Sequence, residues 1–365
     1  MTNLVRDDIA QTEGYAPGEQ PSDTTTIKLN TNENPYPPSP KALAAIAAIA
    51  TSGAEQVRRY PDPTARAFRE EAARLHGVPA DWILTFNGGD DLLNVIIRTC
   101  AGEGDAVAFL EPSYSLYPVL TKIQAARPLV LSYDIEGTEW KLPANIESTD
   151  AALLLIVNPN APSGHLEPLE NIESVVKNFR GVVLIDEAYV NFAKDSALPL
   201  VHKYNNVVIL RSMSKGYSLA GLRFGYAIAQ PSLLKELVKV RDSYPCDVVS
   251  IAAATAALAD QEYARSTWEK VCSERERLYL ALSALGFSMP QSHSNFLLAQ
   301  VPAGANAESI YKELKSRSIL VRWWNLPRLA DKVRITVGTE EQNDKLLSAL
   351  EDIASNVMHS SSSKE

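Results

Sequence analysis

Seven runs of Val, Ile and Leu between residues 82 and 229 constrain the fold of this chain more than any other feature. They alternate with segments of helical periodicity, which include 90–101, 113–126 and 167–179. Strands that read as continuous apolar runs are usually buried on both faces, as in a largely parallel sheet covered by helices. The expected strands are 82–87, 106–111, 128–133, 152–158, 181–188, 206–212 and 223–229. The pattern therefore predicts an α/β domain with a mostly parallel, seven-stranded sheet between helices.

Two further regions flank this alternating pattern. Residues 1–40 are rich in Pro, Thr and Asn and are typical of an extended N-terminal arm. The segment 286–356 has the order strand, helix, strand, strand, helix, which predicts a small α+β C-terminal domain. Residues 41–285 then form the large domain, with their first helix partly in the small domain, and the polar residues 357–365 are expected to form a disordered tail.

The composition argues against several classes of function. A net charge of −9 is unlike a nucleic-acid-binding protein, which carries excess Lys and Arg. The three cysteines have no CxxC spacing and the five histidines no metal-ligand spacing, so we expect neither a disulfide framework nor a metal site. No run approaches the ~20 apolar residues of a membrane span, and the first residues lack the apolar stretch of a signal peptide. We expect a cytoplasmic protein whose ligands are small molecules.

Polar clusters follow four of the expected strands at the point where each strand ends. In doubly wound sheets, ligands bind beyond the carboxyl ends of the strands, where loops lead into helices. The clusters are FNGGDDLLN (86–94), NPNAPSG (158–164), DEAY (186–189) and RSMSK (211–215). Together they predict one site at this edge of the sheet, and the glycines of the first cluster offer backbone amides to a phosphate.

Asp186 and Lys215 indicate which chemistry the site performs. Asp186 directly follows four apolar strand residues, and a carboxylate there is costly unless a cation or a hydrogen-bond donor meets it. A protonated pyridine nitrogen is such a partner, because a carboxylate keeps an electron-accepting ring charged. Lys215 supplies an amine that attacks an aldehyde once burial and nearby cations favour its neutral form.

The residues around Lys215 complete the prediction of a cofactor. Ser212, Ser214 and Arg223 offer donors to a phosphate, and arginine suits a phosphate because its planar fork donates two parallel hydrogen bonds. Tyr114 follows another expected strand and can lay its ring on a flat heteroaromatic face. An aldehyde, a pyridine ring and a phosphate in one molecule describe pyridoxal phosphate.

Each of these features has a plainer interpretation when it is taken alone. An isolated lysine is usually solvated, NGG forms ordinary turns, and Tyr60 before a proline packs like any aromatic residue. Arg322, beside Trp323 and Trp324, has a plain interpretation as an arginine that stacks on an indole ring. The prediction therefore depends on the combination of residues and on none of them singly.

The order of motifs along the chain resembles that of fold-type I (class II) pyridoxal-phosphate-dependent aminotransferases, and within them the histidinol-phosphate aminotransferases. The resemblance spans nearly the whole chain. It is carried by GYAPGEQP, LNTNENP, RRYPDP, NPNAPSG, DEAYVNF, RSMSKGYSLAGLRFG, SNFLL and KVRITVGT, in this order.

This resemblance implies a role for each residue around the cofactor. Lys215 is similar to the lysine that forms the Schiff base, Asp186 to the partner of the pyridine nitrogen, and Tyr189 to the hydroxyl that binds the phenolate oxygen. Tyr114 matches the aromatic residue that stacks on the ring. The implied phosphate ligands are Ser212, Ser214, Arg223, the amides of Gly89 and Asp90, and Tyr60, which in this family reaches across a homodimer interface.

The resemblance also implies a substrate site and a reaction. Arg322 and Arg334 match arginines that bind the anionic end of the substrate, and Tyr15 and Asn34 match residues of the arm that closes over it. The implied reaction converts imidazole-acetol phosphate and glutamate to histidinol phosphate and 2-oxoglutarate in histidine biosynthesis, by a ping-pong route through Lys215. Paired arginines fit a phosphate, and they also fit a carboxylate.

One position departs from the family pattern. The family usually has NPNNPTG, whose second central asparagine helps to hold the phenolate oxygen, and this chain has Ala161 there. Losing one donor costs roughly 1–3 kcal/mol if the acceptor stays unpaired. We expect Asn160 or Asn158 to compensate, or Tyr189 to act alone, with an altered Schiff-base pKa in an active enzyme.

Three other functions remain compatible with this scaffold. Two are enzymes: an aromatic or other amino-acid aminotransferase, and a threonine-phosphate decarboxylase. The third is a non-catalytic regulator that binds pyridoxal phosphate, which is disfavoured because the chain is acidic and has no helix-turn-helix segment before residue 30.

Overall fold

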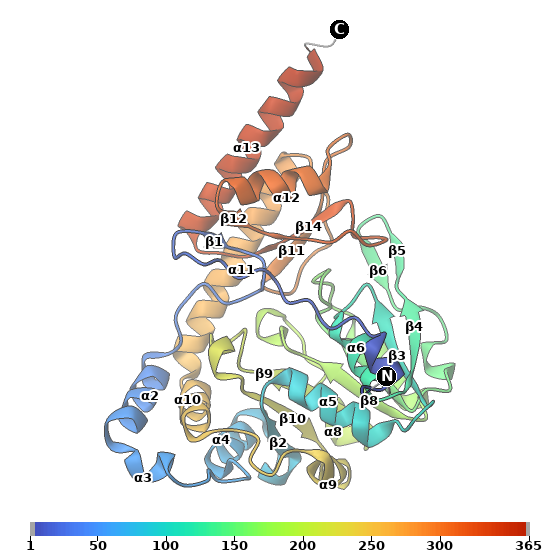
Figure 1. The fold of residues 1–365 in the computed structure, drawn as a ribbon, viewed down its shortest axis with the longest axis vertical. Coiled ribbons are helices and arrows are strands. Elements are labelled where there is room, and N and C mark those ends of the chain that lie inside the picture. The colour runs from blue at the N-terminus through green and yellow to red at the C-terminus, as the bar shows by residue number, and fades with distance from the viewer. Residues whose placement is uncertain (1–3, 363–365) are drawn as a thin grey trace.

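A seven-stranded sheet lies at the centre of the computed structural model, which describes the backbone of residues 4–362 and the side chains of residues 4–355. The strand order is β2-β10-β9-β8-β7-β3-β4, and every strand is parallel to the others except β10, which is antiparallel to both neighbours (Figure 1). The strands are β2 (Ile83–Phe86), β3 (Ala106–Glu111), β4 (Arg127–Ser132), β7 (Leu153–Val157), β8 (Val182–Asp186), β9 (Val207–Ser212) and β10 (Gly225–Ala229). The predicted mostly parallel α/β sheet is confirmed.

Both faces of this sheet are buried, as the continuous apolar runs predicted. Leu154, Ile156 and Ile185 belong to one hydrophobic cluster, whereas Leu155 and Leu184 belong to another on the opposite face, because successive side chains alternate along a strand. The edge strand β4 differs, since its residues are only partly buried or exposed. The covering helices are α4 (Arg66–His76), α5 (Gly89–Cys100), α6 (Leu116–Ile123), α7 (Leu169–Asn178), α8 (Leu200–Lys203), α9 (Pro231–Val240) and α10 (Val248–Ala259).

A second, smaller sheet has its own hydrophobic cluster. It contains β11 (Phe296–Gln300), β14 (Lys332–Thr336) and β13 (Arg322–Trp323), all antiparallel, with α12 (Ala307–Ser316) and α13 (Glu340–Ser362) beside it. The long helix α11 (Gln261–Ala284) leads from the large sheet to this region (Figure 1). The secondary-structure order agrees with the prediction for 286–356, except that two short strands, β12 (Ile319–Leu320) and β13, stand where one was predicted. The division into domains remains a prediction.

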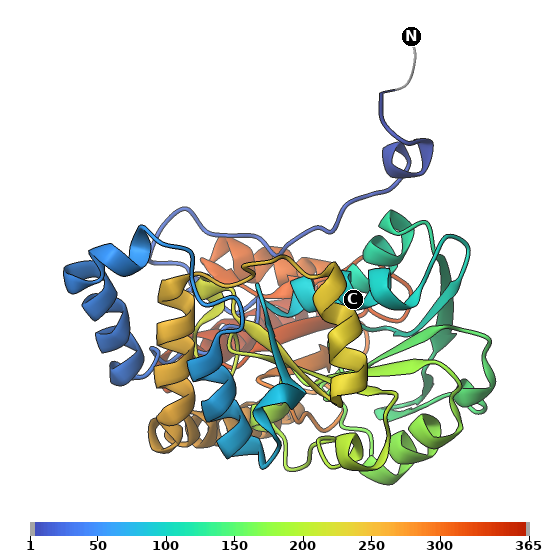
Figure 2. The same ribbon diagram turned by 90° about the horizontal axis from the view of Figure 1, so that it is seen from below.

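The N-terminal arm is attached to the smaller sheet region. Its strand β1 (Ile27–Lys28) pairs in parallel with β12 (Ile319–Leu320), and the Thr336 N–H donates to the Leu29 carbonyl at 2.9 Å. Figure 2 shows the arm continuing across the outside of the body, toward the short helix α1 (Asp7–Ala10). The remaining elements are α2 (Pro40–Ser52), α3 (Ala54–Val57), β5 (Asp134–Glu136) and β6 (Glu139–Lys141).

One expectation about helices needs correction. The last helix continues to Ser362, beyond the predicted end at 356, because an established helix gains one backbone hydrogen bond for each residue added; residues 363–365 of the predicted tail lie outside the described residues. The first helix, α2, packs along α10 (Figure 1), and its assignment partly to the small domain stays a prediction. None of the helices in the described part of the chain is both long and apolar enough to cross a membrane.

Candidate active site

A cavity of about 240 Å³ lies at the carboxyl ends of β3, β7, β8 and β9, where the sequence predicted the site. Loops from these strands, the start of α5, the N-terminal arm and the smaller sheet all contribute to its wall. The predicted site residues that line it are Tyr15, Gly89, Asp90, Tyr114, Asp186, Tyr189, Ser212, Ser214, Lys215, Arg223, Arg322 and Arg334. Residues that are far apart in the sequence therefore meet in one cavity.

Lys215 follows β9 and its amine is buried in this cavity. The amine donates to the Thr31 carbonyl at 2.8 Å. Burial lowers the pKa of Lys215 from 10.5 to about 8, with help from Arg334 and Arg223 and against the attraction of Glu33. A substantial fraction of the amine is therefore neutral near pH 8, as a nucleophile or a general base requires.

Asp186 is the last residue of β8, and its carboxylate is buried. Oδ1 accepts from the Ala188 N–H, and Oδ2 accepts from the Tyr117 hydroxyl, both at 3.0 Å. Burial nevertheless raises the pKa of Asp186 from 3.8 to about 6. Because Asp186 has no ion pair among the described side chains, a cationic partner in the cavity would restore its charged form.

One end of the cavity collects donors for an anion. α5 begins at Gly89 after a glycine N-cap, and both Gly89 and Asp90 line the cavity. Arg223 donates to Asp90 Oδ2 at 3.0 Å, and Ser212, at the end of β9, and Ser214, just after it, are buried in the same cavity wall. A helix N-terminus with an arginine and two hydroxyls is a ready binding site for a phosphate.

Gly88 is required by this geometry. Its φ of 84° lies in the left-handed region, and a Cβ there would approach the Arg223 guanidinium to 2.8 Å. The glycine thus allows the backbone to turn into α5 directly beside the arginine.

The opposite end of the cavity contains two arginines and aromatic rings. Arg334, on β14, is buried; it donates to the Asn30 carbonyl at 2.9 Å and lies over the Trp324 and Phe296 rings. Arg322 donates to the carbonyls of residues 16 and 17 in the arm, at 3.3 Å each, and stacks on Trp324. Neither guanidinium has a carboxylate partner in the described part of the chain, so both remain available to an anionic ligand.

Two tyrosines that line the cavity are held by their neighbours. The Tyr114 hydroxyl donates to Asp90 Oδ1 at 3.0 Å, and the Tyr15 ring meets the Tyr114 ring edge-on at 5.8 Å. The Tyr189 hydroxyl accepts a hydrogen bond from Asn32 Nδ2 at 2.9 Å. Tyr114 therefore lies between the cavity and the Tyr15 ring of the arm.

Three predicted site residues do not line the cavity. The amide of Asn160 donates to the Pro112 carbonyl and to Ser163 Oγ, so the predicted cofactor-binding role of Asn160 has no support in this geometry. Asn34 donates to the Gly216 carbonyl, next to Lys215. Tyr60 is 81% exposed and stacks on Tyr244 at the outer surface.

Three contacts of the site were missed at the sequence level. Thr31 and Asn32, in the motif LNTNENP, bond Lys215 and Tyr189, and Tyr117 bonds Asp186. The motif itself was noticed, but no local pattern shows which of its residues point inward. Tyr117 occupies an apolar position of a helix, where an aromatic residue normally signals only packing.

The residues in this cavity fit pyridoxal phosphate. A buried amine with a lowered pKa fits the aldehyde, a buried carboxylate without a cation fits a protonated ring nitrogen, and the start of α5 with Arg223 fits the phosphate. No three potential metal ligands come together among the described residues.

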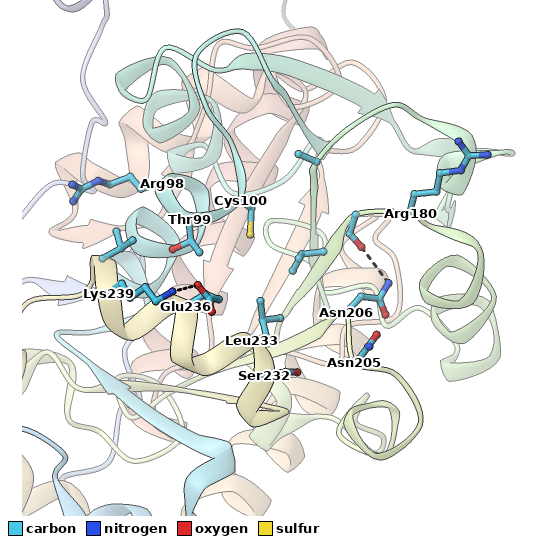
Figure 3. A pocket seen from close by; sticks show the side chains of 14 residues that line it. Arg98, Thr99, Cys100, Arg180, Asn205, Asn206, Ser232, Leu233, Glu236 and Lys239 are labelled. Carbon is cyan, nitrogen blue, oxygen red and sulfur yellow. Dashed lines mark hydrogen bonds and ion pairs between the residues drawn. The ribbon is translucent and has the colours of Figure 1, made fainter.

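A second hollow, of about 630 Å³, lies at the opposite edge of the same sheet (Figure 3). Ala152, Gly181 and Asn206, which line it, come directly before or at the start of β7, β8 and β9, so it faces the amino ends of the strands. Figure 3 shows Arg98 and Arg180 on opposite sides, while Lys239 pairs with Glu236 at 2.5 Å. Its charged side chains do not converge on a common point.

Comparisons with known proteins agree with the chemistry of the cavity. Residues 24–350 match the family described as aminotransferase class I and II. The chain is 46% identical over 355 residues to histidinol-phosphate aminotransferase 1 of Trichormus variabilis, covering 97% of this chain and 99% of that protein. It is 45% identical over 350 residues to the histidinol-phosphate aminotransferase of Geotalea uraniireducens, covering 96% and 99%.

A solved structure is similar in fold as well. The crystal structure of histidinol-phosphate aminotransferase from Sinorhizobium meliloti in complex with pyridoxal-5'-phosphate superposes with a TM-score of 0.83 at 26% identity, covering 91% of each chain. The resemblance inferred from the sequence motifs is thereby confirmed.

Proposed function

This chain belongs to the class I and II aminotransferase family, and we propose that it transfers an amino group between histidinol phosphate and 2-oxoglutarate, with pyridoxal phosphate as cofactor. The observation that carries the proposal is that one cavity contains the buried amine of Lys215, the buried carboxylate of Asp186 and a group of hydrogen-bond donors suited to a phosphate. The relatives that are 44–46% identical over nearly the whole chain support histidinol phosphate as the substrate.

Bound pyridoxal phosphate supplies an electron-accepting ring that stabilises negative charge on the substrate carbon. Lys215 would hold its aldehyde carbon, Asp186 would keep the proton on its ring nitrogen, and Arg223 with the start of α5 would hold its phosphate. The neutral amine of Lys215 would also act as the general base, taking a proton from the substrate carbon and holding it as an ammonium group. The pKa of about 8 suits this role, because a base acts best when its pKa lies near the working pH.

Arg334 and Arg322 would bind the substrate phosphate. Both guanidiniums lie in the cavity wall, and their hydrogen-bond partners are backbone carbonyls of the arm, so they have the charge to neutralise a dianion. The arm that Arg322 holds, with Tyr15, would exclude water from the reacting centre. Two arginines also fit an amino acid's carboxylate, and an aromatic amino-acid aminotransferase is therefore the second candidate.

We further propose that the protein is a homodimer in which Tyr60 binds the cofactor phosphate of the partner subunit. Tyr60 is 81% exposed, and Tyr244, whose ring stacks on it, is 42% exposed. An exposed aromatic pair of this kind is typical of a surface that another chain covers. The three cysteines are free, which supports the predicted cytoplasmic location.

Half-reaction spectroscopy tests the proposed reaction. The protein loaded with pyridoxal phosphate is mixed separately with histidinol phosphate, phenylalanine and threonine phosphate, and the visible cofactor band is followed. We expect histidinol phosphate to remove the band fastest and 2-oxoglutarate to restore it. A faster reaction with phenylalanine, or CO2 release from threonine phosphate, would contradict the substrate assignment. Sedimentation at micromolar concentration tests the dimer.

A further inference from the structure

Ala161 leaves a gap in the cavity wall that the nearby asparagines do not fill. Asn158 and Asn160 are the candidates nearest in sequence, but both are turned away. The Asn158 side chain exchanges hydrogen bonds with the backbone of Glu167, and the Asn160 amide bonds Pro112 and Ser163. Ala161 itself lines the cavity. An oxygen of a ligand on this side would therefore find no side-chain amide donor from the 158–164 loop.

Tyr189 is the remaining hydroxyl on this side, and Asn32 determines where its hydrogen points. Asn32 Nδ2 donates to Tyr189 Oη at 2.9 Å. The Tyr189 oxygen accepts this bond, so its own hydrogen must be directed elsewhere, and the ring is fixed by an edge-on contact with Phe296 at 5.0 Å. Because Tyr189 lines the cavity, the hydrogen is available to a ligand there.

One further hydrogen bond orients the side-chain amide of Asn32, and two others hold its backbone. Thr336 Oγ1 accepts from the Asn32 N–H at 3.0 Å, and its hydroxyl donates to Asn32 Oδ1 at 3.1 Å. Asn295 Nδ2 donates to the Asn32 carbonyl at 2.9 Å. With Oδ1 used in this way, Nδ2 must face Tyr189. Asn32 is 2% exposed and has a φ of 58°, a left-handed conformation that asparagine tolerates better than most residues.

Resting on the proposed function, we propose that Asn32 is a positioning residue, which turns the Tyr189 hydroxyl hydrogen toward the phenolate oxygen of the cofactor and so replaces the amide absent at Ala161. Thr336 on β14 orients Asn32, Asn32 orients Tyr189, and Tyr189 donates to the cofactor. The charged groups that face Tyr189 are Arg334 from β14 and Asp186 from β8, with Tyr15 from the arm.

The same arm segment holds the other reacting groups. Asn30 accepts from Arg334, Thr31 accepts from Lys215, and Asn32 donates to Tyr189. Three consecutive residues thus bond the substrate-binding arginine, the amine and the phenol. Since Thr336 also bonds the backbone of Leu29, the smaller sheet positions this segment as a unit.

The visible spectrum of the cofactor-loaded protein tests the proposal without measuring turnover. Donors to the phenolate oxygen stabilise its negative charge, so losing one raises the pH at which the cofactor band changes. For Asn32→Gly, which suits the left-handed backbone, we expect this apparent pKa to rise by about one unit, as the loss of one hydrogen bond would produce. Asn32→Asp is nearly isosteric, and its carboxylate accepts the Tyr189 hydrogen, so the rise should be at least as large.

Two further variants separate positioning from a general structural effect. Asn30→Ala keeps the backbone carbonyl that Arg334 bonds and removes only an equally buried side-chain amide, which bonds the Glu19 carbonyl, so it should leave the band pKa unchanged. Ala161→Asn in the Asn32→Gly background should move the band pKa back toward the wild-type value, because it supplies the missing donor. Circular dichroism and Tm of each variant confirm that it is folded.

The decisive comparison uses Tyr189→Phe. If Asn32 acts through Tyr189, Asn32→Gly adds no shift in the Tyr189→Phe background. An equal shift in both backgrounds, or no shift for either Asn32 variant, overturns the proposal. A wild-type protein that shows no cofactor band, and no cofactor fixed to Lys215 by borohydride, refutes the proposed function instead.

Discussion

Two hollows lie at the two ends of the strands of the large sheet, one at the amino ends (the amino edge) and one at the carboxyl ends (the carboxyl edge). Their charged side chains differ in burial and pairing. The hollow at the amino ends of the strands is the larger, about 630 Å³ against about 240 Å³ at the carboxyl ends. At the amino edge, Lys239 pairs with Glu236 over an exposed surface. At the carboxyl edge, Lys215 and Asp186 are buried, and neither has a partner of opposite charge in an ion pair among the described side chains.

This difference shows that unsatisfied charge, and not volume, marks the functional edge. An ion pair exposed to water changes the free energy of unfolding very little. A buried unpaired charge destabilises the fold, and a ligand of opposite charge removes this destabilisation. The carboxyl ends of parallel strands are also where loops from several strands converge. The amino edge has the same strands but lacks groups that need a ligand.

Lys215→Ala should produce the largest effect and tests the comparison most directly. We expect turnover to fall by at least about 10³-fold, since a positioned general base contributes 10²–10⁴ and the covalent attachment is lost as well. Borohydride should no longer fix the cofactor to the protein. Lys239→Ala at the amino edge is the matched control and should keep wild-type turnover. Near-normal activity of Lys215→Ala would contradict the assignment of the active site to the carboxyl edge.

Asp186→Asn tests the cost of buried charge through the pH dependence of stability. The pKa of Asp186 is raised from 3.8 to about 6 in the folded protein. Its contribution to stability is therefore full below pH 4 and is lost as the pH rises through 6. Without cofactor, the wild type should lose roughly 3 kcal/mol relative to Asp186→Asn between pH 4 and 7, an upper estimate from the size of the shift.

Urea unfolding of both cofactor-free proteins across this pH range measures the difference. Lys215 titrates above this window and does not interfere. Glu236→Gln, an exposed carboxylate at the amino edge, should leave the pH profile parallel to that of the wild type. A parallel profile for Asp186→Asn as well would mean that burying the charged Asp186 carboxylate does not destabilise the fold.

The parts of the molecule that depend on local pattern were predictable from sequence. The seven strands are identifiable because both faces of the sheet are covered, which gives unbroken apolar runs such as LLLIV before Asn158. The residues at their carboxyl ends, Asp186 and Lys215 among them, could be assigned to one site because parallel strands end at one edge. The edge strand β4 has the same kind of apolar run, but its residues are only partly buried or exposed, so the run alone does not distinguish an edge strand from a central one.

The contacts of the arm could not be predicted in the same way. Asn32 meets Tyr189 across 157 positions, and Thr31 meets Lys215 across 184. No periodicity links such distant positions, and Asn158, Asn160 and Asn32 are equally polar in the sequence. Only the fold shows that Asn158 and Asn160 bond groups away from the cavity, whereas Asn32 lies in the cavity wall.

Arg334→Lys tests whether the buried guanidinium binds the substrate anion. Lysine keeps the charge but loses the planar fork and one hydrogen bond, so we expect KM for histidinol phosphate to rise about tenfold with a smaller change in kcat. Steady-state kinetics measure both constants. Arg98→Lys at the amino edge is the control and should change neither. An unchanged KM for Arg334→Lys would assign the phosphate to other residues.

Tyr60→Phe should give the smallest effect. It tests whether the cofactor site at the carboxyl edge needs a residue from a second copy of the chain. Tyr60 lies on the outer surface, so its hydroxyl reaches a cofactor phosphate only in a second copy of the chain. Losing one hydrogen bond to a phosphate should weaken pyridoxal phosphate binding by about tenfold or less. Equilibrium titration of the cofactor-free protein with pyridoxal phosphate measures this affinity. Tyr244→Phe keeps the stacked ring pair and should bind pyridoxal phosphate as the wild type does. Equal losses of affinity in both variants would indicate that the two rings only pack against each other, and that one chain forms the whole cofactor site.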